Sequence, residues 1–124
     1  MLRVYNLHLD HISESARRLG MECALRRVRE DATKADAEIV ILGDFNARPD
    51  SAAISLCKTY PLIDVTSEIP ASFHDFGKRN PPVKIDYIFL SDGLASRVSE
   101  VSAWTDERNG VYLSDHYPIS AVLK

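Results

Sequence analysis

The run from residue 38 to residue 42, Glu-Ile-Val-Ile-Leu, constrains the fold of this chain more than any other segment. Its apolar, mostly β-branched side chains follow one another without polar alternation, which is typical of a strand buried on both faces. Gly43 ends the run, and Asp44, Phe45 and Asn46 follow it directly. The sequence therefore predicts a buried strand whose end carries polar side chains.

The remaining pattern predicts a mixed α/β fold. Residues 2–9 largely alternate between apolar and polar side chains, which favours a strand. Ser13 is a suitable N-cap for a helix that runs to about residue 34, because a serine side chain accepts one of the first free N–H groups. Further elements are expected along the chain: a short helix over 52–59, an irregular stretch over 60–82, and strands over 83–90, 97–104 and 117–123.

The composition fits one globular domain. At 124 residues the chain has the length of a single domain with one core, so we expect one domain over 1–124. A hydrophobic fraction of 45% excludes a disordered chain, and no apolar run approaches the roughly 20 residues that span a bilayer. The net charge of −3 argues against tight, nonspecific binding of duplex nucleic acid. Two cysteines, Cys23 and Cys57, indicate buried free thiols in a reducing cytoplasm.

Polar side chains follow apolar runs at two places. Asp44 and Asn46 are two residues apart, so both can project toward the same side while Phe45 points into the core. Asp115 and His116 precede the last predicted strand. Such groups at the mouth of a buried sheet are what Mg²⁺, and the phosphate that it carries, would require. Gly, Asp and Asn are also ordinary turn residues, so the first string alone leaves a plain turn open.

His116 is the candidate general base for a water molecule. A base of this kind needs a carboxylate on its other ring nitrogen, and Asp86 is the candidate for that position. Asp86 shares one strand face with Ile88 and Leu90, where an unpaired carboxylate is costly. A surface aspartate on a half-exposed strand is the alternative interpretation.

The other histidines raise a rival interpretation. His8, Asp10 and His11 have a spacing that some dinuclear zinc hydrolases also show. Zinc prefers nitrogen and sulfur ligands, whereas the chain has four histidines in all and its candidate ligands are mostly oxygen, so magnesium is favoured. His8 is open to a structural role, which is also the simpler interpretation of His11. His74, in the irregular stretch, fits either substrate contact or loop packing.

Taken in order, the polar strings resemble the endonuclease/exonuclease/phosphatase superfamily, the deoxyribonuclease-I-like phosphodiesterases and phosphatases. The strings are Asn6-Leu7-His8, Gly43 to Pro49, Phe73-His74, Ile85-Asp86-Tyr87 and Ser114 to Pro118, and they span nearly the whole chain. The details around residues 49–51 and at Phe73-His74 look most like the bacterial metal-dependent hydrolase branch. The resemblance implies hydrolysis of a phosphoester with Mg²⁺ or Mn²⁺.

The resemblance also implies catalytic roles. Asp44 would hold the metal and orient the attacking water, and Asn46 would contact the phosphate. His116 would act as the base or bind phosphate, with Asp86 supporting it.

Three further residues receive roles from the resemblance. Asp115 would lie near the metal. His8 would contact the phosphate or assist the leaving group, and His74 would contact the substrate. The substrate itself stays open among nucleic acids, lipids and small phosphoesters, although the acidic balance slightly favours a small or lipid phosphoester.

The resemblance covers only the C-terminal half of the superfamily fold, a four-layer α/β sandwich. It implies one mixed, largely antiparallel sheet with helices on one face. The N-terminal glutamate that holds the metal in the superfamily has no counterpart here, so we expect little activity from these 124 residues alone. A catalytically silent domain that keeps a phosphate site is the alternative function. We also expect the uncovered sheet face to meet a second copy in a two-fold homodimer.

Overall fold

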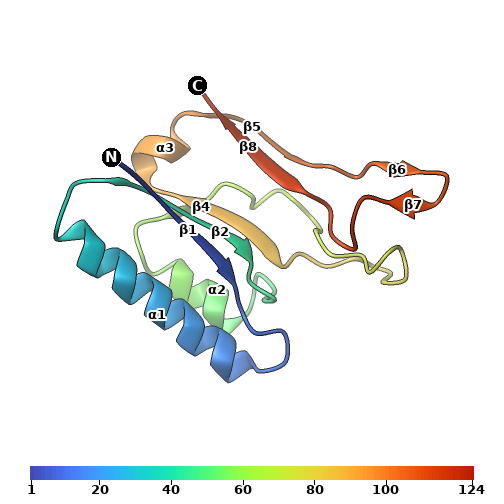
Figure 1. Cartoon of the computed structure of the whole chain (residues 1–124), viewed down its shortest axis with the longest axis horizontal. Coiled ribbons are helices and arrows are strands. Elements are labelled where there is room, and N and C mark those ends of the chain that lie inside the picture. The colour runs from blue at the N-terminus through green and yellow to red at the C-terminus, as the bar shows by residue number, and fades with distance from the viewer.

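Four strands form a mixed sheet at the centre of the structure, a computed structural model that describes residues 1–124 (Figure 1). Across the sheet the order is β1 (Leu2–His8), β2 (Glu38–Asp44), β4 (Asp86–Leu90) and β3 (Ile63–Asp64). β1 runs parallel to β2, whereas β4 is antiparallel to both of its neighbours. The predicted mixed sheet is confirmed, and the apolar run at 38–42 forms an interior strand.

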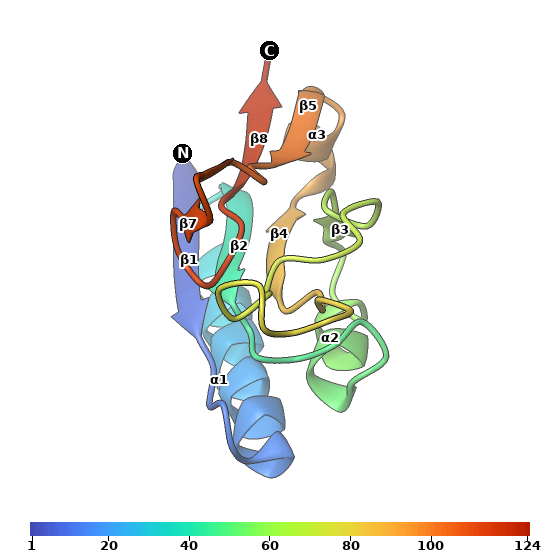
Figure 2. The same ribbon diagram turned by 90° about the vertical axis from the view of Figure 1, so that its right-hand side faces the viewer.

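Two helices cover one face of this sheet (Figures 1 and 2). α1 (Glu14–Ala32) begins where the sequence predicts, because Ser13 Oγ accepts the N–H of Ala16 at 3.2 Å. α2 (Ala52–Cys57) is shorter than predicted and has Ser51 as its N-cap. The core between helices and sheet contains large buried side chains: Met21, Leu25, Val28, Ile41, Phe45, Ile54, Tyr87 and Phe89.

The opposite face of the sheet is only partly covered. Beside it lies a ribbon of two antiparallel strands, β5 (Val98–Ala103) and β8 (Ile119–Leu123), which α3 (Asp92–Ala95) connects to β4 (Figure 1). An apolar groove separates the ribbon from β2 and β4. The sequence predicts both strands, but they form a separate two-stranded sheet. They do not extend the central sheet at β4, because β2 and β3 already occupy both edges of that strand.

The structure confirms the predicted turn at Asn109-Gly110 and one of the two predictions for the cysteines. β6 (Glu107–Arg108) and β7 (Val111–Tyr112) form a hairpin, and Asn109 and Gly110 make its predicted turn with φ values of 54° and 77°. Cys57 is buried as expected, whereas Cys23 is exposed, so the prediction of a buried thiol at Cys23 was wrong. None of the helices is long and apolar enough to cross a lipid bilayer.

Three segments pair with one another just before β4, at Phe73, Val83 and His116. β4 itself begins at Asp86 and not at the predicted residue 83. Val83 leaves the sheet because it pairs with Phe73 in an isolated bridge, and Phe73 also pairs with His116. Ser72 Oγ accepts the N–H of Asp86 at 3.0 Å. These contacts bring the segment before β8 to the ends of β2 and β4.

Candidate active site

Three neighbouring strands of the central sheet, β1, β2 and β4, carry polar side chains at ends that lie side by side, and these strand ends form one edge of the sheet. His8 is the register partner of Asp44, and Asp44 is the register partner of Asp86. Because side chains alternate along a strand, Asp44 shares its face with Leu42, and Asp86 shares its face with Ile88. The polar groups therefore lie on the face opposite the helices, at one end of the apolar groove.

Gly43 allows β1 and β2 to approach each other closely at this edge. Its φ of +133° lies in a region that residues with a side chain rarely adopt. A Cβ atom built there would lie 2.0 Å from the carbonyl oxygen of Leu7, a severe clash with backbone. Glycine is therefore required at the position that aims Asp44 at the site.

Asp44 and Asn46 form both a turn and part of the site. Asn46 has a left-handed φ of 47°, and its backbone N–H donates to Asp44 Oδ1 at 2.8 Å. Its side-chain Nδ2 donates to the carbonyl of Leu9 at 2.9 Å. Phe45 between them is fully buried, as predicted. The turn and the functional interpretation, which the sequence leaves as alternatives, are thus compatible.

His116 reaches this edge from the segment before β8. Its Nδ1 lies 2.8 Å from Asp86 Oδ2, a hydrogen bond that fixes the ring. The other ring nitrogen, Nε2, lies 3.8 Å from Asp44 Oδ2. His8, whose side chain is 77% exposed, places its Nε2 3.6 Å from the same oxygen of Asp44. The structure thus brings four of the predicted residues, His8, Asp44, Asp86 and His116, together at one place.

The ionised form of Asp44 is disfavoured by its surroundings. Burial raises the pKa of Asp44 above its usual range. The hydrogen bond from Asn46 acts in the opposite direction, and the nearby charge of Asp86 raises the pKa again. Two carboxylates are therefore held close together where a cation would stabilise their ionised forms.

The donor set fits a divalent metal ion. Asp44, Asp86 and His116 offer ligand atoms that all lie within 4.8 Å of one another. Two of the three donors are carboxylates, which suits a hard cation such as Mg²⁺ better than zinc. Asp86, predicted from the sequence only as the partner of His116, is thus also a candidate ligand.

Two predicted residues stand apart from this group. The carboxylate of Asp115 accepts a hydrogen bond from Ser114 Oγ at 3.0 Å and does not belong to the metal-ligating group. His74 is only 2% exposed, and its ring packs between those of Tyr112 and Tyr117 at centroid distances of 4.6 and 4.2 Å. Its ring has almost no surface to offer a substrate, so the geometry favours the loop-packing alternative for His74.

Sequence reasoning missed the contact that packs against His116. The ring of Phe73 lies 4.9 Å from the imidazole of His116. Arg79 contacts Phe73 and not His116, with its guanidinium carbon 5.8 Å from the centre of the Phe73 ring. Ser72 is fully buried beneath them. The string Ser72-Phe73-His74 is visible in the sequence, but its contacts join segments far apart along the chain. No local pattern predicts such contacts.

Comparison with known families decides the relationship. The profile of the Endonuclease/Exonuclease/phosphatase family matches residues 2–116. The chain belongs to this family. The match includes every strand that contributes to the candidate site, and it confirms the resemblance in the sequence. No curated protein matches the chain significantly.

Solved structures share the fold. A conserved protein of unknown function from Enterococcus faecalis V583 is 27% identical with a TM-score of 0.79; the match covers 98% of this chain and 49% of that one. The mannosyl-6-phosphatase Bt3783 from Bacteroides thetaiotaomicron VPI-5482 is 22% identical (TM-score 0.78, coverage 98% and 50%). A 3′ phosphatase from Neisseria, NExo, bound to a product DNA hairpin, is 18% identical (TM-score 0.78, coverage 99% and 61%). The chain spans about half the length of the first of these structures.

Proposed function

We propose that this chain carries the catalytic edge of a metal-dependent phosphoester hydrolase. The observation that supports this most is the arrangement of Asp44, Asp86 and His116, which come from three separate segments and meet at one edge of the sheet. Family membership supports a hydrolase, and two structural neighbours are named as phosphatases.

His116 is the proposed general base. The hydrogen bond between its Nδ1 and Asp86 fixes the ring and leaves Nε2 to accept a proton. Nε2 and Asp44 Oδ2 are 3.8 Å apart, too far for a direct hydrogen bond, so both can contact one water molecule. Asp44 orients this water, and His116 takes its proton as the water attacks phosphorus.

Asp44 and Asp86 are the side chains that would hold the divalent metal, with Asp115 as a further candidate that would have to turn toward them. A bound Mg²⁺ or Mn²⁺ would polarise a phosphoryl oxygen and offset the negative charge of the site. The pKa of Asp44 is raised mainly by burial and further by the charge of Asp86, and a bound cation would offset both effects.

Asn46 and His8 are the proposed contacts to the phosphate. An amide donates a hydrogen bond to a phosphate oxygen without adding negative charge, and Asn46 retains one N–H of its side chain beyond the bond to Leu9. The exposed ring of His8 is placed to bind the phosphate or to donate a proton to the leaving group. A small or lipid phosphoester is favoured over a long nucleic acid by the net charge of −3.

A second candidate function follows from the length of the match. Because the chain spans about half of the structures it resembles, a silent domain that retains a phosphate site without turnover is the alternative. This domain would bind phosphate or metal at the same residues.

A phosphodiester reporter separates the two functions. We expect weak cleavage of bis(p-nitrophenyl) phosphate that requires Mg²⁺ or Mn²⁺ and is lost in Asp44→Ala and in His116→Ala. Asp36→Ala, which removes an exposed carboxylate elsewhere, is the matched control. Activity that survives both site substitutions would exclude the hydrolase proposal. No turnover at any metal concentration would favour the silent domain.

A further inference from the structure

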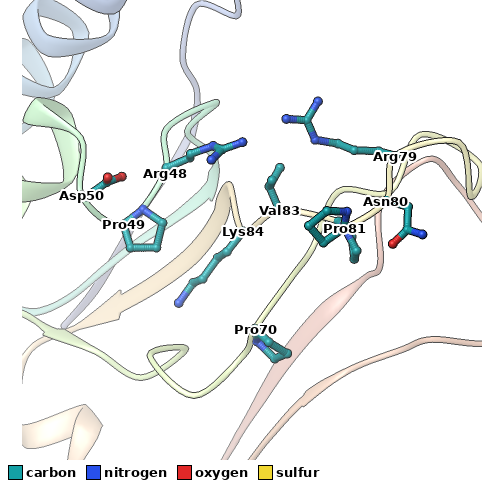
Figure 3. Close-up of a pocket in the computed structure, with 10 residues that line it drawn as sticks. Arg48, Pro49, Asp50, Pro70, Arg79, Asn80, Pro81, Val83 and Lys84 are labelled. Atoms are coloured by element: carbon teal, nitrogen blue, oxygen red, sulfur yellow. The ribbon is translucent and has the colours of Figure 1, made fainter.

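An open hollow of about 670 Å³ lies between the loop that follows β2 and the loop that precedes β4 (Figure 3). Arg48 and Arg79 line it, and Figure 3 shows their guanidinium groups pointing toward one another across it. The same two arginines also line a second hollow, together with Asn46 and Phe73. The two hollows therefore lie side by side, and the second one reaches Asn46 and Phe73, which flank the proposed catalytic edge.

A third arginine joins this pair. Arg17, from the first turn of α1, lines the second hollow with Arg48 and Arg79. Its Nε is buried and has no hydrogen-bond partner, although its Nη1 donates to the carbonyl of Asp10 at 3.1 Å. A buried donor without an acceptor is costly in a folded protein. The Nε itself is out of reach of the hollow, so only the remainder of the Arg17 guanidinium is available to a ligand there.

The three arginines lack counter-charges. None of them forms a salt bridge with a protein carboxylate. Glu14 and Asp50 also line the second hollow, but each lies beyond ion-pair distance from these guanidinium groups. Lys84 lines the first hollow and differs from the arginines, because Asp64 pairs with it at 3.4 Å. Three unpaired guanidinium groups facing one space favour an anion there.

The hollow is linked to the catalytic edge by direct contacts. The guanidinium carbon of Arg79 lies 5.8 Å from the centre of the Phe73 ring, and that ring lies 4.9 Å from the ring of His116. On the other side, Arg48 is two residues beyond Asn46, the proposed phosphate contact. An anion held by the arginines would therefore sit beside a phosphoester held at the site.

We propose that Arg17, Arg48 and Arg79 form a second anion subsite, and that the substrate carries a second phosphate group that occupies it. This inference rests on the proposed hydrolase function and narrows its substrate to compounds with two phosphates. The second phosphate belongs either to a small bisphosphorylated molecule or to the neighbouring nucleotide of a short strand.

Binding to the full chain tests the subsite without requiring turnover. The probes are fructose 6-phosphate and fructose 1,6-bisphosphate, titrated into ¹⁵N-labelled protein while the arginine Nε–H and backbone resonances are followed. We expect the bisphosphate to bind about tenfold more tightly, since bidentate arginine–phosphate contacts are among the stronger hydrogen bonds. In the double variant Arg48→Gln/Arg79→Gln this advantage should fall below about twofold while the affinity for the monophosphate is unchanged.

Matched variants make the outcome specific. Arg26→Gln/Arg27→Gln removes two exposed arginines of α1 and changes the net charge by the same amount. Because neither arginine lines the hollows, this variant should keep the preference for the bisphosphate. A second pair of probes, the dinucleotide TpT with and without a 5′-phosphate, identifies the source of the second phosphate. The pair with the larger arginine-dependent gain gives the substrate class.

Equal affinities for the mono- and bisphosphates would overturn the subsite. An equal loss of both affinities in the Arg48/Arg79 variant would overturn it as well, because the arginines would then belong to a single phosphate site. Asn46→Ala reports on the proposed function separately. If it leaves both affinities unchanged while the arginine-dependent preference persists, the proposed site fails and the subsite stands.

Discussion

The position of Asp44 favours chemistry but disfavours the ionised form of its carboxylate. Its position at the end of β2, behind Gly43, aims it at both imidazoles, which suits chemistry. The same position buries its carboxylate beside Asp86, which raises its pKa and disfavours the ionised form. Carboxyl groups with a perturbed pKa are common at functional sites.

Asp44→Asn should therefore stabilise the protein while it removes activity. A raised pKa means that ionising Asp44 costs more in the folded protein than in the unfolded chain, so this cost is present at neutral pH. We expect a gain of about 0.5–2 kcal/mol in the free energy of unfolding at pH 7, the usual size of a stabilising substitution. The gain should shrink as the pH falls through the folded-state pKa toward the ordinary value of 3.8.

Urea denaturation at several pH values measures this effect. Asn keeps the shape of Asp and its Oδ1 can still accept the N–H of Asn46, so a change in packing is not expected. A loss of stability at pH 7, or a gain that persists unchanged below pH 3.8, would contradict the account of Asp44.

The elements of the site are joined by one serine. Ser72 Oγ accepts the N–H groups of Ile85 and Asp86, each at 3.0 Å, and its carbonyl accepts the N–H of Tyr117 at 2.7 Å. Ser72 thus connects the start of β4 to the segment that carries His116. The geometry between Asp86 and His116 depends on this connection.

Ser72→Ala should destabilise the protein and loosen the site. It leaves two backbone N–H groups without acceptors in a buried environment, at a cost of about 2–4 kcal/mol. Ser99→Ala removes an exposed hydroxyl that donates to the carbonyl of Val122, and should change stability by less than about 0.5 kcal/mol. Thermal unfolding of both variants checks the difference. Equal stabilities would show that Ser72 does not hold these segments together.

Local sequence patterns predict the helices, strands and turns better than they predict which of these elements contact one another. The β-branched run at 38–42, the Ser13 cap and the Asn109-Gly110 turn each depend on neighbours in sequence, and each is found where predicted. The contact of His116 with Asp86 also follows the prediction, because the need of a buried carboxylate for a partner limits the choice.

Contacts between distant segments set the limit of the sequence analysis. β5 pairs with β8 and β3 pairs with β4, and no local pattern shows which strand each will choose. The burial of His74 between Tyr112 of β7 and Tyr117 depends on segments far apart along the chain. Arg48 and Arg79 likewise line the same hollow although they lie far apart along the chain.

At the scale of the whole molecule, one sheet face remains open. Leu2 and Val4 of β1 are 58% and 56% exposed on the face opposite the helices. The apolar groove between the central sheet and β8 continues this surface. An exposed apolar surface of this kind indicates an interface.

We propose that a second copy of the chain covers this face with two-fold symmetry. Analytical ultracentrifugation at micromolar concentration should show a dimer. Val4→Glu should shift it to the monomer, because it places a charge in the apolar contact. Leu19→Glu, at an exposed position of α1 on the helical side of the sheet, should leave the dimer intact. A stable monomer of the unmodified chain would contradict the proposal.

We propose that Asp44 and Asp86, beside His116, form one metal-binding edge of the sheet. Line broadening of backbone amide resonances by Mn²⁺ tests it most directly, because it reports position and does not depend on turnover. We predict broadening confined to the ends of β1, β2 and β4 and to the segment around His116, relieved by excess Mg²⁺ and lost in Asp44→Asn. Broadening elsewhere on the molecule, or at this edge with equal strength in Asp44→Asn, would contradict the account.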